Sequence, residues 1–243
     1  GWSSRWDSAG ASPIGIPAWK AWRARTRSTT SERVRDVIRS RGPRAEWAAV
    51  RKGSRSESIA AATDVILPGA PLDVVAYGCT SASMAIGEEK VFDKIRSVRP
   101  AARCTTPITA AFAAFRALKA RRIGVLTPYR ADVNRIVADY IRARGFAVPV
   151  FGSFNEQDDS VVARITPASI KAGIDAIAAR AAIDAVFVSC TSVRLAEAAR
   201  EIESELGLPV TSSNHAMAWH ALRLAGIDDA LPQWGRLFET GLA

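Results

Sequence analysis

From about residue 57 onward, short apolar segments alternate with longer segments of helical periodicity. The apolar segments predict buried strands at 72–77, 122–127, 147–152, 185–189 and 209–211. The helical periodicity predicts the end of a helix at 58–65 and helices at 83–98, 109–120, 132–144, 166–182, 194–206 and 214–225. Strands that alternate with helices of this length form parallel sheets, and uninterrupted apolar strands belong to sheets covered on both faces. We therefore expect an α/β protein with mainly parallel sheets.

Residues 1–56 do not follow this pattern, and we treat them as an atypical basic N-terminal segment. They contain no strand of good quality, and 31–41 is their candidate helix. They carry 11 Arg and 2 Lys against 4 acidic residues, so the whole net charge of +9 lies in them, together with five of the seven Trp. A basic arm could bind phosphate backbones, but no groove-reading motif accompanies it. We do not expect nucleic acid as a partner.

The length and composition exclude several other classes of protein. A chain of 243 residues with 48% hydrophobic residues can bury a sizeable core. No apolar run approaches the ~20 residues that a membrane span needs, and no secretory signal is visible. Three cysteines without a secretion signal indicate reduced thiols. We expect a soluble cytoplasmic protein that does not contact a membrane.

The most informative feature is an internal repeat that contains a cysteine. Leu72–Ser81 (LDVVAYGCTS) aligns with Ile183–Ser192 (IDAVFVSCTS), 111 residues later, and the two segments share Asp, Val, Cys, Thr and Ser in register. Repeats separated by ~100 residues indicate two similar α/β halves, because that is the length of one small domain. In each half the cysteine follows a predicted strand, and ligands of open α/β sheets bind at the carboxyl ends of strands.

This position suits Cys79 and Cys190 to acid–base or nucleophilic chemistry. The positive end of a following helix stabilises a thiolate, and free N–H groups with Thr and Ser side chains can hold a carboxylate oxygen. Two such turns facing each other would let one thiolate attack a carbon or remove its proton while the other thiol returns a proton. The alternatives are two buried core cysteines or a metal site, and the isolated spacing is poor for zinc. We assign the pair to catalysis.

These motifs resemble a known family. Tyr77–Ser83 and Phe187–Thr191 resemble the two cysteine motifs of the aspartate/glutamate racemase superfamily, in the branch that contains maleate isomerases, arylmalonate decarboxylases and ectoine-utilisation proteins. The ectoine-utilisation proteins look nearest, on four further stretches: Ile66–Gly69, Ala114–Leu118, Val125–Tyr129 and Thr211–Asn214. The resemblance covers about residues 57–226 and does not cover 1–56.

The resemblance implies two pseudo-symmetric flavodoxin-like lobes with the site in the cleft between them. The first lobe would comprise 57–105 plus 213–243 and the second 106–212, with the last helix returning to the first lobe. No cofactor or metal is implied. Cys79 and Cys190 would be the catalytic pair, and the substrate-binding residues would be Thr80, Ser81, Tyr129, Thr191, Ser192 and Asn214. Asn214 is equally readable as a helix cap.

The implied function is a cofactor-independent racemase or isomerase that acts on a small carboxylate with two cysteines, in ectoine catabolism. Both cysteines are present, which argues against the arylmalonate decarboxylase type, because that type keeps the second one alone. The alternatives are a maleate cis–trans isomerase and a non-catalytic relative that binds a small acid. Assembly as a homodimer is left open.

Four other residues also have candidate chemistry. Cys104 also precedes Thr but lacks a preceding apolar strand, so we interpret it as structural. His215 and His220 are five positions apart, which does not place them on one helix face as a metal pair requires. Asp159 lies near a position where similar isomerases tend to have Asn, so it would alter carboxylate recognition; the alternative is an acidic surface loop.

Overall fold

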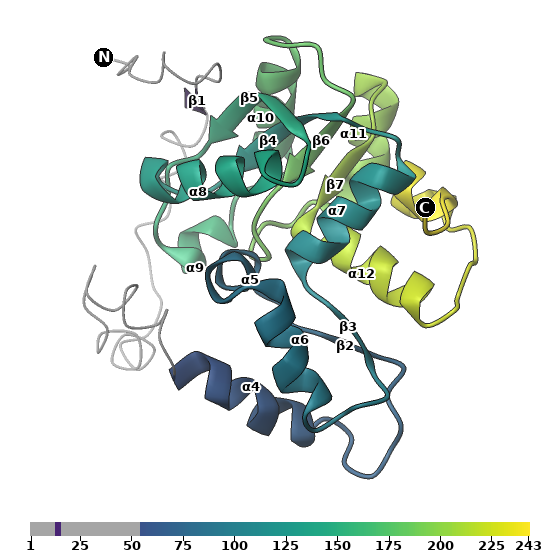
Figure 1. Ribbon diagram of the computed structural model, residues 1–243. Coiled ribbons are helices and arrows are strands. Elements are labelled where there is room, and N and C mark those ends of the chain that lie inside the picture. Colours follow the sequence, from purple (N-terminus) through teal and green to yellow (C-terminus); the bar gives the residue numbers. More distant parts are fainter. Residues whose placement is uncertain (1–12, 16–53) are drawn as a thin grey trace, which may run out of the picture.

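Two parallel sheets organise the molecule, and we call them the large sheet and the small sheet (Figure 1). The computed structural model describes residues 13–15 and 54–243. Within these residues the large sheet has five strands in the order β1-β5-β4-β6-β7, and all neighbouring strands are parallel. Its strands are β1 (Pro13–Gly15), β4 (Arg122–Thr127), β5 (Ala147–Ser153), β6 (Ala185–Val188) and β7 (Val210–Ser212). The prediction of an α/β fold with mainly parallel sheets is confirmed.

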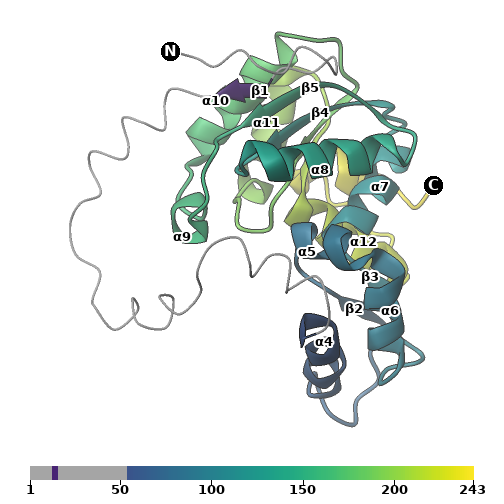
Figure 2. The same ribbon diagram turned by 60° about the vertical axis from the view of Figure 1, so that its left-hand side comes forward.

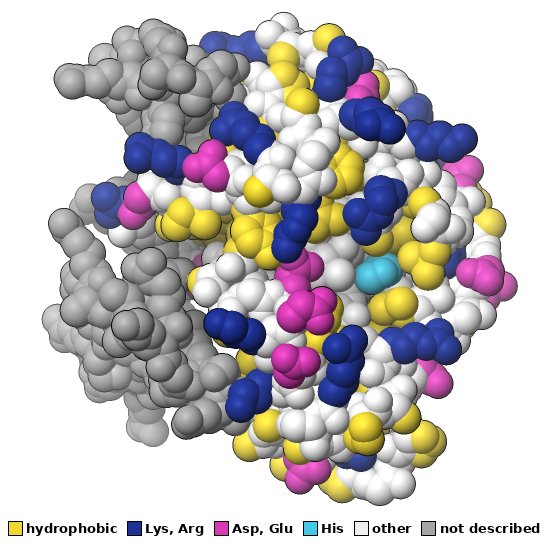
Figure 3. Space-filling view, in the orientation of Figure 1, with side chains coloured by type: hydrophobic (Ala, Val, Ile, Leu, Met, Phe, Trp, Pro, Cys, Tyr) yellow, Lys and Arg dark blue, Asp and Glu magenta, His cyan; other side chains and the backbone are white. Residues whose placement is uncertain are grey.

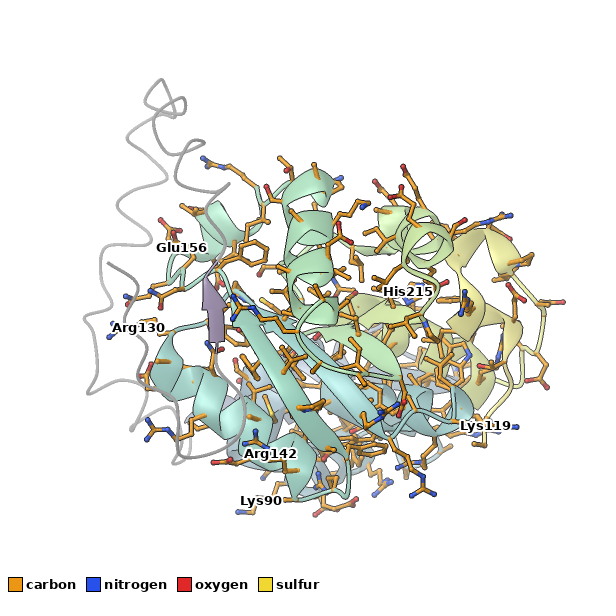
Figure 4. The ribbon with its side chains drawn as sticks, turned by 90° about the horizontal axis from the view of Figure 1, so that it is seen from above. Lys90, Lys119, Arg130, Arg142, Glu156 and His215 are labelled. Atoms are coloured by element: carbon orange, nitrogen blue, oxygen red, sulfur yellow. The ribbon has the colours of Figure 1, made fainter. Side chains whose placement is uncertain are left out.

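Helices cover both faces of the large sheet, as its uninterrupted apolar strands require. On one face α7 (Pro107–Ala117) and α8 (Ala131–Arg142) pack against β4, β5 and β6. On the other face lie α9 (Asp159–Val162), α10 (Pro167–Ala178) and α11 (Ala199–Leu206). Figure 4, which looks down from above, shows α8 and α10 on opposite sides of the sheet. An apolar core on each face of the sheet therefore fixes the carboxyl ends of β4 and β6.

The small sheet pairs β2 (Val74–Ala76) with β3 (Arg103–Thr105). Three helices accompany it: α4 (Ser54–Asp64), α5 (Thr80–Ile86) and α6 (Glu88–Arg96). Ile59 of α4 and Ile95 of α6 are buried together with Val75 of β2 in one apolar cluster. Figures 1 and 2 place α5 between the small sheet and the large sheet. The residue that begins α5 is therefore close to both sheets.

The helix α12 (Ser213–Leu224) links the two sheets. It follows β7 directly, packs against α7, and also contacts β2 and β3. The Thr105 hydroxyl of β3 and Nδ1 of His220 are hydrogen-bonded at 2.8 Å. The chain then runs through three-residue and four-residue 3₁₀ turns, Pro232–Trp234 and Arg236–Glu239, and Trp219 packs against Leu237 and Phe238. The helix thus contacts both sheets, and its return to the first lobe stays a prediction, as do the lobe boundaries.

The predicted helix at 83–98 is wrong, because two helices occupy this stretch. Gly87 separates α5 from α6 and has a φ of 94°, which side-chain-bearing residues rarely adopt. The first of the two helices begins at Thr80, three residues earlier than predicted. This shift puts the helix N-terminus immediately after Cys79, as the proposed chemistry of that cysteine requires.

Two short strands were not predicted. Cys104 follows no apolar strand, as stated, but lies inside β3; this strand is three residues long and contains Arg103 and Thr105, which hides it from a search for apolar runs. Residues 13–15 form β1, which pairs with β5 at the edge of the large sheet. The candidate helix at 31–41 and most of the basic segment lie outside the described residues. No helix among those that the structure describes is long and apolar enough to cross a membrane.

Candidate active site

The first cysteine turn consists of Tyr77–Ser81 and joins the end of β2 to α5. Cys79 is the residue before the helix, with an extended backbone, and its carbonyl oxygen accepts the Ser83 N–H at 3.0 Å. The Ser83 hydroxyl donates to the same carbonyl. The Cys79 Sγ lies 3.9 Å from Oγ of Ser81, and the cysteine is half-buried. The thiol therefore stands at a helix N-terminus with partial access to solvent.

The second cysteine turn consists of Ser189–Ser192 after β6, and it differs from the first. Cys190 is 5% exposed and has a φ of 149°. The Ser192 N–H donates to its Sγ at 3.4 Å. No helix follows at once: a 3₁₀ turn spans Ala196–Ala198 and α11 begins only at Ala199. The predicted helix at 194–206 is therefore shorter, and the expectation of a helix N-terminus at Cys190 is wrong.

Tyr129 follows β4 and packs against the apolar cluster that contains Cys190. Its backbone is fixed from three sides: its N–H donates to Oγ1 of Thr127 at 3.2 Å, and its carbonyl accepts Nδ2 of Asn134 at 2.9 Å and the hydroxyl of Ser153. Burial raises the pKa of the phenol well above 10, and the negative charges of Cys190 and Cys79 raise that pKa further. Two thiols 111 residues apart in the sequence thus raise the pKa of one phenol. This phenol is neutral at neutral pH and remains a hydrogen-bond donor.

The electrostatic environment of Cys190 favours its protonated form. Burial raises the pKa of this thiol above 9. The N–H of Ser192 and the hydroxyl of Tyr129 oppose that rise in pKa, and the carboxylate of Asp159 adds to it. Cys190 is therefore a thiol at neutral pH, with polar donors in place to stabilise the thiolate when it forms.

Four of the six predicted substrate-binding residues belong to the two turns themselves, and Tyr129 and Asn214 come from other segments. Thr80 is 1% exposed and its hydroxyl donates to Oγ of Ser213 at 2.8 Å, so its backbone N–H is the group left for a substrate. Asn214 donates from Nδ2 to the Thr191 carbonyl oxygen at 2.6 Å, which ties α12 to the second turn. Ser212, not Asn214, caps α12, because its hydroxyl accepts the His215 N–H.

Two serines near Cys190 were not singled out from the sequence. Ser189 is fully buried, its hydroxyl makes no hydrogen bond within the usual distance, and it lies near the Tyr129 phenol. Ser213 accepts the Cys190 N–H at 3.0 Å. Two sequence features could have identified them. The repeat has a small residue before each cysteine, at 78 and 189, and Ser213 lies in the stretch Thr211–Asn214 that resembles the family.

The two histidines on α12 are structural. Both are buried, and burial lowers the pKa of each below 6.5. Nε2 of His215 is hydrogen-bonded to the Trp234 carbonyl oxygen at 2.6 Å and its Nδ1 to Oγ1 of Thr211 at 3.1 Å (Figure 4). Among the residues that the structure describes, no group of three His, Cys, Asp or Glu side chains could hold a metal ion.

On the face shown in Figure 3, Lys and Arg side chains are interspersed with Asp and Glu.

Comparison with known proteins shows the family. The model of the family described as arylmalonate decarboxylase matches residues 56–238. The chain belongs to this family. It is 30% identical to the maleate isomerase of Pseudomonas putida over 183 residues, 72% of this chain and 73% of the relative. It is 34% identical to the arylmalonate decarboxylase of Bordetella bronchiseptica over 138 residues, 56% of this chain and 58% of the relative, so the match spans less than two thirds of that protein.

One similar solved structure carries chemical information. A cysteine-to-serine mutant of the Nocardia farcinica maleate cis–trans isomerase, with a covalently bound succinylcysteine intermediate, superposes with a TM-score of 0.65. The two are 25% identical, and the match covers 76% of each chain. The resemblance to the wider branch of isomerases and decarboxylases is thereby confirmed, whereas closeness to the ectoine-utilisation proteins stays a prediction.

Proposed function

We propose that this protein is a cofactor-independent isomerase that acts on a small carboxylate with Cys79 and Cys190. The observation that carries the proposal is that Ser213 holds the two cysteine turns together, while the neutral phenol of Tyr129 packs against the cluster that contains Cys190 and is affected by the charge of Cys79. One bound carbon beside this phenol is then within reach of two cysteines, which is the arrangement that paired proton transfer needs. The N–H groups at the start of α5 and the phenol are donors for the carboxylate of the substrate.

The unequal surroundings of the two thiols favour cis–trans isomerisation of an unsaturated acid. The Cys79 thiolate adds to one carbon of the double bond, and the electron pair of that bond takes the proton of the buried Cys190 thiol at the other carbon. Rotation about the resulting single bond follows. The Cys190 thiolate then removes the proton again, the double bond re-forms in the trans geometry, and the Cys79 thiolate leaves. No atom or electron is gained or lost overall.

The succinylcysteine reported for the Nocardia farcinica relative supports this sequence of steps, because it is an adduct of the same kind. The repeated Cys-Thr-Ser sequence supports the second candidate, racemisation, in which each cysteine serves one face of the same carbon. The stretches similar to ectoine-utilisation proteins support a substrate from ectoine catabolism. These finer assignments are part of the proposal.

The direct test is a screen in heavy water followed by proton NMR. The panel contains maleate, other small unsaturated acids, and both enantiomers of small 2-substituted acids. We expect cis-to-trans conversion, or uptake of deuterium at one carbon, which reports C–H bond breaking whatever the product is. Binding of panel members without conversion or exchange would contradict the proposal and favour the small-acid-binding relative.

Asp159 is expected to select against substrates with two negative charges. Its exposed carboxylate raises the pKa of Cys190, so its potential reaches the site. Replacing Asp159 with Asn removes a repulsion, and KM for a dicarboxylate should fall by about three- to tenfold at low salt while KM for a monocarboxylate changes little. Asp93→Asn, the same charge change on exposed Asp93 of α6, serves as the control. Equal changes in KM for both substrate classes would contradict this prediction.

A further inference from the structure

One buried hydroxyl joins the two cysteine turns. Ser213, the first residue of α12, is fully buried, and its Oγ accepts two hydrogen bonds. One comes from the hydroxyl of Thr80, the residue after Cys79, at 2.8 Å. The other comes from the backbone N–H of Cys190 at 3.0 Å. The partners lie 133 and 23 residues away along the chain, so a single oxygen connects the start of α5 to the turn that follows β6.

The fold places Ser213 there for a simple reason. β7 lies beside β6 in the large sheet, and Val188 of β6 is aligned with Ser212 of β7. The residue after Ser212 is therefore beside the second cysteine turn. Because α12 then runs on to contact β2 and β3, its first residue also meets the start of α5, where Thr80 lies.

The hydrogen bond to Cys190 supports a costly backbone conformation. A φ of 149° is rarely adopted by residues with a side chain, and such a conformation persists only when the surroundings hold it. The Cys190 N–H is buried with this residue, so losing its acceptor would leave an unpaired donor. The direction of the Cys190 thiol toward Tyr129 depends on this backbone, because Sγ and the N–H belong to the same residue.

We propose that Ser213 is a positioning residue that sets the two cysteine turns at a fixed separation, so that both thiols address one bound carbon. The Thr80 hydroxyl fixes the start of α5 and with it Cys79, and the Cys190 N–H fixes the second turn. The catalytic consequence rests on the proposed function, whereas the effect on the turns does not.

The test compares Ser213→Ala with Ser212→Ala. Ser212 is the adjacent serine, equally buried, and its loss removes the cap of α12 without touching either turn. The first readout needs no substrate: mass spectrometry follows iodoacetamide labelling of each cysteine in the folded protein at alkaline pH. Because the Cys190 turn loses its support, we expect Ser213→Ala to raise Cys190 labelling about three- to tenfold over the wild type and over Ser212→Ala.

The second readout is turnover of the substrate found in the screen. Ser213→Ala should lower kcat by about 10- to 100-fold while KM stays within about threefold, because misplaced reacting groups slow the reaction more than they weaken binding. Thr80→Val removes one of the two hydrogen bonds and should lower kcat by about tenfold. The double variant should be little worse than Ser213→Ala alone, because both changes break the same connection.

The outcomes separate this proposal from the proposed function. If no panel acid is converted, the labelling result still decides whether Ser213 holds the turns. Unchanged labelling in a folded Ser213→Ala protein would overturn the proposal, and so would altered labelling with unchanged kcat. If Ser213→Ala does not fold, Thr80→Val carries the test, and wild-type kcat in that variant would overturn the proposal.

Discussion

Replacing Cys190 with serine is expected to lower turnover by at least ~10²-fold and to leave a covalent adduct on Cys79. A serine hydroxyl is far less acidic than a thiol, so it neither supplies the proton to the adduct efficiently nor removes it again. Cys79, half-buried at the start of α5, can still add to an unsaturated acid. Intact-protein mass spectrometry after incubation with maleate should show one added substrate, and peptide mapping should place it on Cys79.

The matched control for this variant is Cys104→Ser. Cys104 is the third free cysteine and lies in β3, outside the two turns, so its replacement should leave turnover and adduct formation as in the wild type. An adduct that maps to another residue in Cys190→Ser would reverse the assigned roles of the two thiols. Wild-type turnover in that variant would eliminate the two-thiol mechanism.

Replacing Cys79 with serine is expected to abolish both turnover and adduct formation. The addition step needs a thiolate, and Cys190 cannot replace it, because burial raises the pKa of that thiol and keeps it protonated at neutral pH. Turnover should again fall by at least ~10²-fold, and the mass of the protein after incubation with maleate should be unchanged. The two single variants are thus unequal under cis–trans isomerisation.

Racemisation predicts a different result for the same two variants. Each remaining cysteine would then exchange the proton on its own face of the substrate carbon. Cys79→Ser would exchange deuterium into one enantiomer, and Cys190→Ser into the other. Measuring exchange for both enantiomers in both variants therefore distinguishes the two reactions without further structural work.

The large sheet could be predicted from the sequence because its strands are apolar without interruption. The predicted strand at 122–127 has the bounds of β4, and 147–152 and 185–189 differ from β5 and β6 by one residue. Three-residue strands offer no such pattern. β3 contains Arg103 and Thr105 and no apolar run. It still pairs with β2, because sheet pairing needs only backbone hydrogen bonds.

The internal repeat predicted the positions of the two cysteines, but not the differences between their surroundings. The repeat placed both cysteines after strands, which the structure shows. It also suggested equivalent surroundings for them, and here the outcome is different, because only Cys79 precedes a helix directly. Hydrogen bonds between distant segments leave no local pattern: Ser212 and Ser213 are the same residue type, yet one caps a helix and the other joins two turns.

The position of α12 has a consequence for synthesis on the ribosome. β2 and β3 emerge early, but the helix that packs against them begins more than 100 residues after β3 ends. At about 5–20 residues per second, the nascent chain exposes that side of the small sheet for roughly 5 to 20 s. During this interval β2 and β3 lack the contacts that α12 makes with them, and the first cysteine turn lacks Ser213. The connection between the two cysteine turns thus waits for the synthesis of α12, and a chain released before residue 213 would carry both cysteines without it.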